Sequence, residues 1–386
     1  MVSHTRLSRY RAGTKQVIVA KDWDFLPRST RCGAASTGQH PPARSSRAVC
    51  PVDWGMTTPT PSDDHLADFK AAATAIQGAE RIALACHVNP DGDALGSMLG
   101  LAIALRSIGK HVDILSADGV PETMKFLPES TSVLRTSPIA TYDLGIGMDA
   151  GDAKRMGPNM DTILGCPIVI DIDHHVTSGV FGNIRIVDGH RASTCELVYD
   201  LLVVLGIPLN PEIAQCLMCG IYTDTGGFRY PATTAGTFQI GAALRAAGAN
   251  ADAIVANVFE NRTETAQRLL GRALVQMGRS DGGAIVWSVI TLSDFAATGA
   301  LDSETDGVSH ALRSVRGAKV AILMREQAGG GFRTSLRCSE GIDVSKVAAT
   351  FGGGGHRLAS GCTVPAATGD EALRQVLDVL AEAGVH

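Results

Sequence analysis

The stretch His87-Val-Asn-Pro-Asp91-Gly-Asp93-Ala-Leu-Gly-Ser97 decides the fold of this chain, because it sets an imidazole and two carboxylates between two apolar segments. Residues 82–86, just before it, form a short unbroken apolar run, which is typical of a buried parallel strand. Residues 94–108 are a longer apolar run closed by Gly109, which indicates a buried helix. The polar side chains therefore fall in a strand-to-helix loop at the carboxyl edge of a parallel sheet, where ligand sites form.

Three further segments end in residues of the same kind. Asp149 ends another strand-like run, the triplet Asp173-His174-His175 ends a third, and Asp224 follows an apolar, helix-like run. These segments offer three histidines and five carboxylates, and even two histidines with four carboxylates carry too much charge for one ion and suit two divalent cations such as Mn²⁺ or Mg²⁺ bridged by a carboxylate. Paired ions about 3.5–4 Å apart are the usual device for displacement at phosphorus, where one activates a water and both clamp the developing charge.

These motifs resemble those of the DHH phosphoesterase family in order and spacing. The stretch at 87–97 is similar to the first motif, Asp149-Ala-Gly-Asp-Ala-Lys-Arg155 to the second, the triplet at 173–175 to the third, and Thr223-Asp224-Thr225-Gly226 to the fourth. Phe351-Gly-Gly-Gly-Gly-His356-Arg-Leu-Ala-Ser-Gly361 resembles the glycine-rich signature of the DHH-associated C-terminal domain. The resemblance covers residues 64–379, and its nearest form is the two-domain NrnA-type branch, oligoribonucleases (nano-RNases) that also act as pAp phosphatases.

The resemblance implies a role for each polar residue of these motifs. One ion would be held by His87, Asp91 and Asp149, and the other by Asp93, Asp149, His174 and Asp224, with Asp149 as the bridge. The residues expected to take part in catalysis are Asp149, His174, His175 and Asp173. Among these, His174 is expected as a metal ligand, His175 as a phosphate contact, and Asp173 as the carboxylate that orients an imidazole. Any single Asp of this set is as well explained as a helix cap or turn residue, but the joint pattern favours a site.

A second set of residues is expected to bind substrate, partly in the C-terminal half. Four glycines alone can be a simple loop, but the histidine that follows them favours an anion site, since glycine N–H groups can approach a phosphate closely. Arginines on a nearby strand can add guanidinium contacts, although each is also explained as a solvated surface residue. The expected substrate-binding residues are His175, Arg155, Arg333, Arg337, Gly353, Gly354, Gly355 and His356.

The predicted fold class is α/β, with a parallel-sheet DHH domain and a smaller α/β C-terminal domain facing it across a cleft. Strand and helix signals alternate along residues 57–250, residues 251–282 indicate a helical linker, and residues 283–386 form the second unit, with a hairpin turn at 329–331. Residues 1–55 hold nine Lys or Arg and three acids, so they carry +6 while the rest carries −11. We interpret them as a disordered extension, or as an over-long start with Met56 as the initiator.

Composition predicts a cytoplasmic enzyme that does not enter a membrane, since no uninterrupted apolar run is long enough to span one. The nine cysteines are scattered, and only Cys216 and Cys219 form a C-x-x-C pair. Because they lie in an apolar helical stretch, we expect them to be buried rather than to bind zinc or to act in redox chemistry.

The expected activity is a Mn²⁺-dependent phosphoesterase that degrades short oligonucleotides and linear dinucleotides to mononucleotides, and pAp to AMP. Two Mn²⁺ ions are the expected cofactors, with Mg²⁺ or Co²⁺ as alternatives, and a homodimer is left open. Hydrolysis of cyclic dinucleotides such as c-di-AMP is an alternative, as is a RecJ-like 5′–3′ exonuclease, although this would need further nucleic-acid-binding modules. A manganese pyrophosphatase would lack the glycine-His signature, and a non-enzymatic nucleotide sensor would have an impaired set of metal ligands.

Overall fold

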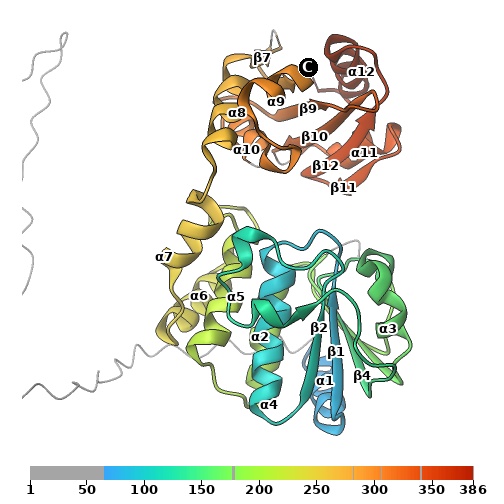
Figure 1. Ribbon diagram of the computed structural model, residues 1–386, viewed down its shortest axis with the longest axis vertical. Coiled ribbons are helices and arrows are strands. Elements are labelled where there is room, and N and C mark those ends of the chain that lie inside the picture. The colour runs from blue at the N-terminus through green and yellow to red at the C-terminus, as the bar shows by residue number, and fades with distance from the viewer. Residues whose placement is uncertain (1–64, 176–178, 281, 306, 340, 386) are drawn as a thin grey trace, which may run out of the picture. The chain divides into compact units, whose positions relative to one another are not determined.

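The computed structural model describes residues 65–175, 179–280, 282–305, 307–339 and 341–385. Within them the chain forms two α/β domains, each built on its own six-stranded sheet (Figure 1), so the predicted class of two α/β domains is confirmed, while the cleft between them stays a prediction. The predicted extension at residues 1–55, with Met56, lies outside the described residues. No helix in the described part of the chain is both long and apolar enough to cross a membrane.

The N-terminal sheet is entirely parallel, with its strands in the order β3-β2-β1-β4-β5-β6. The strands are β1 (Arg81–Cys86), β2 (His111–Leu115), β3 (Val133–Leu134), β4 (Leu144–Met148), β5 (Ile168–Asp173) and β6 (Ile184–Val187). Strands β1, β4 and β5 are almost wholly buried, because helices cover both faces of the sheet, and this is why each reads as an unbroken apolar run. The short edge strands β3 and β6 are not among the predicted strands.

Alternate residues of β1 face the two layers of helices. Ile82 and Leu84 pack in one core with α1 (Leu66–Gly78), α2 (Gly92–Ser107), α4 (Thr194–Leu205) and α5 (Pro211–Asp224). Ala83 and Ala85 pack in a second core with α3 (Met160–Leu164).

Helices α2 and α5 pack closely because small residues lie where they meet. A Cβ added at Gly96 of α2 would lie 2.4 Å from the carbonyl oxygen of Cys216 in α5. Cys216 and Cys219 are themselves fully buried in this core, which confirms the prediction for the C-x-x-C pair.

The segment after α5 is mostly helical up to Val275, which includes most but not all of residues 251–282, the predicted helical linker. It contains α6 (Ala235–Ala246), α7 (Ala251–Ile254), a π-helical turn at Val255–Glu260 and α8 (Glu264–Val275). Leu269 and Ala273 of α8 share a core with Val286 and Ile290 of the C-terminal sheet. Helix α8, which falls in the predicted linker, therefore packs on the C-terminal domain.

The C-terminal sheet is mixed, with its strands in the order β11-β12-β10-β9-β8-β7. Only the pair formed by β8 (Ile285–Ile290) and β9 (Val320–Glu326) is parallel among its described strands. The others are β7 (Gly278–Arg279), β10 (Phe332–Cys338), β11 (Gly354–His356) and β12 (Ala359–Val364). Its helices after α8 are α9 (Leu292–Thr298), α10 (Val308–Arg313), α11 (Val344–Thr350) and α12 (Gly369–Glu382).

Two glycine-rich segments of this domain have different structures. The predicted hairpin turn joins β9 to β10, and in it the N–H of Gly330 donates to the carbonyl oxygen of Gln327 at 2.9 Å. The string at 352–355 is a loop only at its start, because β11 begins at Gly354 and pairs antiparallel with β12.

Candidate metal centre

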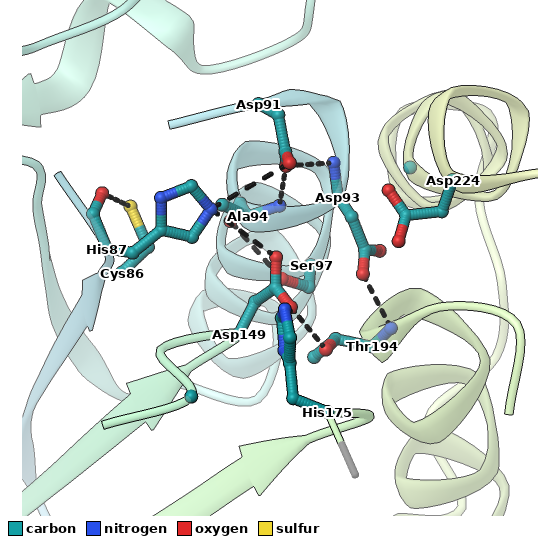
Figure 2. A network of polar contacts seen from close by, with 12 residues as sticks. Cys86, His87, Asp91, Asp93, Ala94, Ser97, Asp149, His175, Thr194 and Asp224 are labelled. Carbon is teal, nitrogen blue, oxygen red and sulfur yellow. Dashed lines mark hydrogen bonds and ion pairs between the residues drawn. The ribbon is translucent and has the colours of Figure 1, made fainter. Parts of the chain in front are cut away.

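The loop between β1 and α2 supplies His87 and Asp91, and the first turn of α2 supplies Asp93 (Figure 2). Asp91 is the N-cap of α2, and its Oδ1 accepts the N–H groups of Asp93 and Ala94, each at 3.0 Å. Its other oxygen, Oδ2, lies 3.8 Å from Nε2 of His87. One carboxylate thus caps the helix and faces the imidazole at the same time.

His87, Asp91 and Asp149 form one cluster of potential ligands, which we call the His87 group. Nε2 of His87 lies 3.7 Å from Oδ2 of Asp149. Nδ1 of the same ring lies 2.8 Å from the carbonyl oxygen of Val88. A proton on Nδ1 that is donated to this carbonyl leaves the lone pair of Nε2 directed at the carboxylates, as a metal ligand requires.

Asp93, His174 and Asp224 form a second cluster, which we call the His174 group. Nε2 of His174 lies 3.1 Å from Oδ2 of Asp224 and 3.7 Å from Oδ2 of Asp93. Nδ1 of His174 lies 3.3 Å from the carbonyl oxygen of Arg191, so this ring is oriented in the same way as His87.

Asp149 lies between the two groups. Its Oδ2 faces His87, whereas its Oδ1 lies 3.6 Å from Nε2 of His174. Oxygens or nitrogens bound to one octahedral cation at about 2.1 Å lie about 3 Å apart, close to the spacings found here. The donor set and its spacing therefore fit two divalent ions with Asp149 as the shared carboxylate.

The electrostatics of the site indicate a need for positive charge. Burial lowers the pKa of His87, but the neighbouring carboxylates outweigh it and raise this pKa to about 10. For His174 the same balance raises the pKa to about 11. Burial, followed by the charges of Asp224 and Asp149, raises the pKa of Asp93 well above its ordinary value. The buried carboxylates thus stabilise cations in this space, whether protons on the imidazoles or metal ions.

The N-terminus of α4 holds two of these carboxylates, which the sequence analysis did not predict. The N–H groups of Thr194 and Cys195 donate to the two oxygens of Asp93 at 2.6 and 3.0 Å, and the hydroxyl of Thr194 donates to Asp149 at 3.1 Å. Ser193, the N-cap residue, makes no capping hydrogen bond of its own within the described structure, so Asp93 caps α4 in its place. No local pattern signals this contact, because the partners are about a hundred residues apart.

The remaining residues of the triplet at 173–175, Asp173 and His175, pair with each other, and Nδ1 of His175 also lies 3.4 Å from Oδ1 of Asp149, close enough to form a third cluster with His174. Asp173 is fully buried, and its Oδ1 lies 2.6 Å from Nδ1 of His175 while its Oδ2 accepts the N–H of Gly151 at 2.8 Å. The structure thus pairs Asp173 with His175, whereas His174 belongs to the second cluster. Arg155 lies close by, since a Cβ on Gly151 would be 2.9 Å from its Nη1 and 3.9 Å from the ring of His175.

Comparison with known proteins identifies both domains. Residues 81–221 match the DHH family, N-terminal domain, and residues 291–383 match the DHHA1 domain. A bifunctional oligoribonuclease and PAP phosphatase NrnA from Thermus thermophilus is 32% identical over 308 residues, which is 78% of this chain and 89% of the relative. The chain belongs to the DHH phosphoesterase family.

Two further similarities extend over both domains of this DHH phosphoesterase. NrnA from Bacillus subtilis is 27% identical over 306 residues, covering 78% of this chain and 94% of that protein. The crystal structure of an exopolyphosphatase-related protein from Bacteroides fragilis superposes with a TM-score of 0.77 at 28% identity, covering 82% of this chain and 96% of that one. Both similarities therefore cover most of this chain and nearly all of the other protein.

The DHHA1 domain of the phosphoesterase contains a pocket of about 540 Å³ over its sheet. Alternation along β10 puts Arg333, Ser335 and Arg337 on the open face, and all three line the pocket. Arg325 of β9, the register partner of Arg333, lines it as well but was not predicted. Arg325 is almost wholly buried, and its Nη1 lies 2.9 Å from Oδ2 of Asp302, so it differs from a solvated surface arginine.

The predicted glycines of the DHHA1 domain have unequal positions. Gly353 and Gly354 line the pocket, whereas Gly355 is not among its described lining residues. A Cβ at Gly353 would lie 2.2 Å from the carbonyl oxygen of Gly361, and one at Gly355 would lie 2.7 Å from that of Ala359. These two glycines are thus required for packing against β12. The side chain of His356 lies outside the described part of the structure.

Proposed function

We propose that this protein is a Mn²⁺-dependent phosphoesterase that hydrolyses short oligonucleotides and linear dinucleotides to mononucleotides, and pAp to AMP. The observation that carries the proposal is the position of Asp149, which presents one oxygen to the His87 group and the other to the His174 group. The extended similarity to NrnA proteins, described as bifunctional oligoribonucleases and PAP phosphatases, supports this choice of substrates.

We assign one ion to the His87 group and the other to the His174 group, with Asp149 shared. Two divalent cations supply an activated water and countercharge for an in-line displacement at phosphorus. The protein contributes a fixed set of ligand orientations, because both imidazoles are held through Nδ1 by backbone carbonyls. We choose Mn²⁺ because the site mixes imidazole with carboxylate, while Mg²⁺ favours oxygen ligands and retained waters.

We assign His175 and Arg155 to the substrate phosphate. His175 is held by Asp173, a buried carboxylate that also accepts a backbone N–H, so its ring is fixed before substrate binds. Such preorganised donors stabilise the charge that develops in the transition state more than mobile ones do. Arg155 is exposed beside the metal residues and can pair with a phosphate oxygen through its guanidinium.

We assign the pocket of the DHHA1 domain to the part of the substrate that does not react. Arg333 and Arg337 supply positive charge for a terminal phosphate. The volume of the pocket is within the range of about 300–1,000 Å³ typical of small-molecule sites. An anchor of this size favours one or a few nucleotides over long strands, which is the basis of the proposed preference for short substrates.

The test compares turnover of pApA, a five-nucleotide RNA, pAp, c-di-AMP and a thirty-nucleotide RNA strand by the full chain with Mn²⁺, Mg²⁺, Co²⁺ or EDTA. We expect hydrolysis of the first three with Mn²⁺, slower rates with Mg²⁺, and none with EDTA. Preferential turnover of c-di-AMP, or equal rates on a thirty-nucleotide strand and on pApA, would contradict the proposed substrate class. Full activity in EDTA would contradict the two-metal assignment.

A further inference from the structure

Arg191, in the turn before α4, is enclosed by carboxylates. Its guanidinium bonds closely to Oδ2 of Asp200, lies 3.5 Å from Oδ2 of Asp188 and lies 3.8 Å from Oε2 of Glu196. Asp200 and Glu196 project from α4 and are 0% and 1% exposed. Arginine is suited to such a position, because its planar fork of donors can serve several carboxylates at once.

The backbone around Arg191 contacts the proposed metal ligands. The carbonyl oxygen of Arg191 lies 3.3 Å from Nδ1 of His174. The same turn runs directly into Thr194, whose N–H and hydroxyl hold Asp93 and Asp149. Residues 191–195 therefore contact two of the three members of the His174 group, His174 and Asp93, together with the shared carboxylate Asp149.

The guanidinium anchors this turn to α4. The N–H of Ala192 adds a bond of 3.4 Å to Glu196, the same acid that faces Arg191. Removing one partner of a buried ion pair leaves an uncompensated charge and is strongly destabilising. Asp200 and Glu196 would be left in that state without Arg191, and the turn would lose its main attachment to the helix.

We propose that Arg191 is a positioning residue for the proposed second metal ion: by pairing with Asp200 and Glu196 it fixes the carbonyl that orients His174. The inference rests on the proposed function, because it takes the His174 group to hold an ion. Arg191 itself touches neither metal nor substrate in this account. Its effect passes through the backbone to one imidazole, so it should alter one metal site and spare the other.

The experiment titrates the full chain with Mn²⁺ alone, by calorimetry, in the wild type and in Arg191→Met and Arg191→Lys. Asp224→Ala and Asp91→Ala, each lacking a ligand of one group, identify which binding step belongs to which site. We expect Arg191→Met to weaken the step lost in Asp224→Ala by about 10–100-fold, the usual effect of removing an outer-shell partner. The step lost in Asp91→Ala should keep its wild-type affinity, and Arg191→Lys should be intermediate.

Turnover gives an independent readout. All ligands remain in Arg191→Met, so we expect its rate on pApA to fall at limiting Mn²⁺ and to recover substantially at high Mn²⁺. Asp224→Ala lacks a ligand and should not recover. If Arg191→Met is too unstable to purify, Asp200→Asn removes the closest charge at constant size and should shift the same binding step in the same direction.

Arg106→Met is the matched control. Arg106 also pairs with a carboxylate, Glu129 at 2.8 Å, and bonds to the carbonyl of Val112, but it lies in the last turn of α2, at the other end from the ligand loop. Arg106→Met should lower the stability of the fold and leave both Mn²⁺ affinities unchanged. A folded Arg191→Met or Asp200→Asn with both affinities unchanged would overturn the positioning role while the wild type still binds two ions. A wild type that binds fewer than two would contradict the proposed function and this inference with it.

Discussion

The backbone of Asp149 has a φ of 52°, in the left-handed region that Asp and Asn adopt more readily than most residues with a side chain. Its N–H donates to the carbonyl oxygen of Ile172 at 2.9 Å, so the neighbouring strand β5 holds it there. The position thus restricts the residue type through backbone conformation as well as through charge. A substitution that tests the charge alone must therefore keep the size of the side chain and adopt the same left-handed conformation.

Asp149→Asn meets that condition, because it keeps the size and the left-handed preference but loses the negative charge. We expect its turnover of pApA to fall by at least about 100-fold, more than the loss of an outer-shell partner causes. Without metal, its free energy of unfolding should stay close to wild type, because the variant loses the attraction of Asp149 to protonated His87 and His174 and also its repulsion of Asp93. Rates at saturating Mn²⁺ and urea denaturation in EDTA measure the two effects. A variant with near wild-type rate would contradict the shared-ligand assignment.

At this scale the sequence predicts some residues and not others, for a physical reason. His87, Asp91 and Asp93 were predictable, because they directly follow an apolar run and strand ends meet at one edge of a parallel sheet. Thr194 and Arg325 were not, because each acts through a partner that only the fold brings near: Asp93 for Thr194 and Asp302 for Arg325. A lone threonine or arginine in a sequence carries no sign of such a partner.

Helix α9 begins with a capping box of Thr291 and Asp294. The carboxylate of Asp294 accepts the N–H of Thr291 at 2.9 Å and also bonds to Arg272 at 2.8 Å and Gln276 at 3.0 Å, both on α8. It therefore joins two helices of the DHHA1 domain as well as capping one. Burial raises the pKa of Asp294, but these hydrogen bonds outweigh it and hold the pKa below its ordinary value.

Asp294→Ala should lower the free energy of unfolding of the DHHA1 domain by about 1–2 kcal/mol at pH 7. The folded-state pKa is lowered, so the ionised carboxylate stabilises the fold above the unfolded-state value of about 3.9, and this is lost as pH falls through the folded-state pKa. The difference between wild type and variant should therefore be constant from pH 5 to 8 and shrink below pH 4. Denaturation at several pH values measures it, and a difference that grows on acidification would contradict the assignment.

The glycines at the start of β11 differ in whether a side chain could be accommodated. A Cβ at Gly354 would have no atom within 4 Å, whereas one at Gly353 would lie 2.2 Å from a backbone oxygen of β12. The sequence shows four equivalent glycines, and it could not distinguish them because the difference arises from the pairing with β12.

Gly353→Ala and Gly354→Ala form a matched pair that tests this difference. We expect Gly353→Ala to lower stability by about 1–3 kcal/mol, the usual cost of overpacking. Gly354→Ala should keep the wild-type melting temperature but raise KM for pApA, because its methyl group enters the pocket. Thermal melts and steady-state kinetics of both variants decide the matter. If Gly354→Ala unfolds, or Gly353→Ala is as stable as wild type, the packing assignment is wrong.

The fold of the whole molecule was largely predictable, because both domains alternate apolar runs with turn residues. The parallel order of the DHH domain follows from its unbroken buried strands. The edge strands β3, β6, β7 and β11 were not predicted, since they are short and derive their structure from the strand beside them. Strand β12 was missed as well. Helix α1 was also missed, and it covers one face of the sheet through a core in which Phe69 and Ile76 are buried.

The division of labour between the domains can be tested with two substrates. Arg333→Ala and His356→Ala change the DHHA1 domain, whose pocket we assign to nucleotide binding. We expect both to reduce kcat/KM strongly for pApA and pAp, yet to leave bis-p-nitrophenyl phosphate, which offers no nucleotide, much less affected. Mn²⁺ content measured by mass spectrometry should stay at the wild-type level. Loss of metal, or equal losses on both kinds of substrate, would contradict the division.

The capping of α4 by Asp93 bears on how a substrate complex could be captured. Three of the proposed ligands also have a structural role. Asp93 caps α4, Asp91 caps α2, and Asp149 adopts a left-handed backbone conformation. Within the described residues, Asp224, at the end of α5, makes its polar contact with His174 and caps no helix. For crystals with intact pApA, the best inactive variant is therefore Asp224→Asn. It should lose hydrolysis but keep the capping hydrogen bonds at the N-termini of α2 and α4.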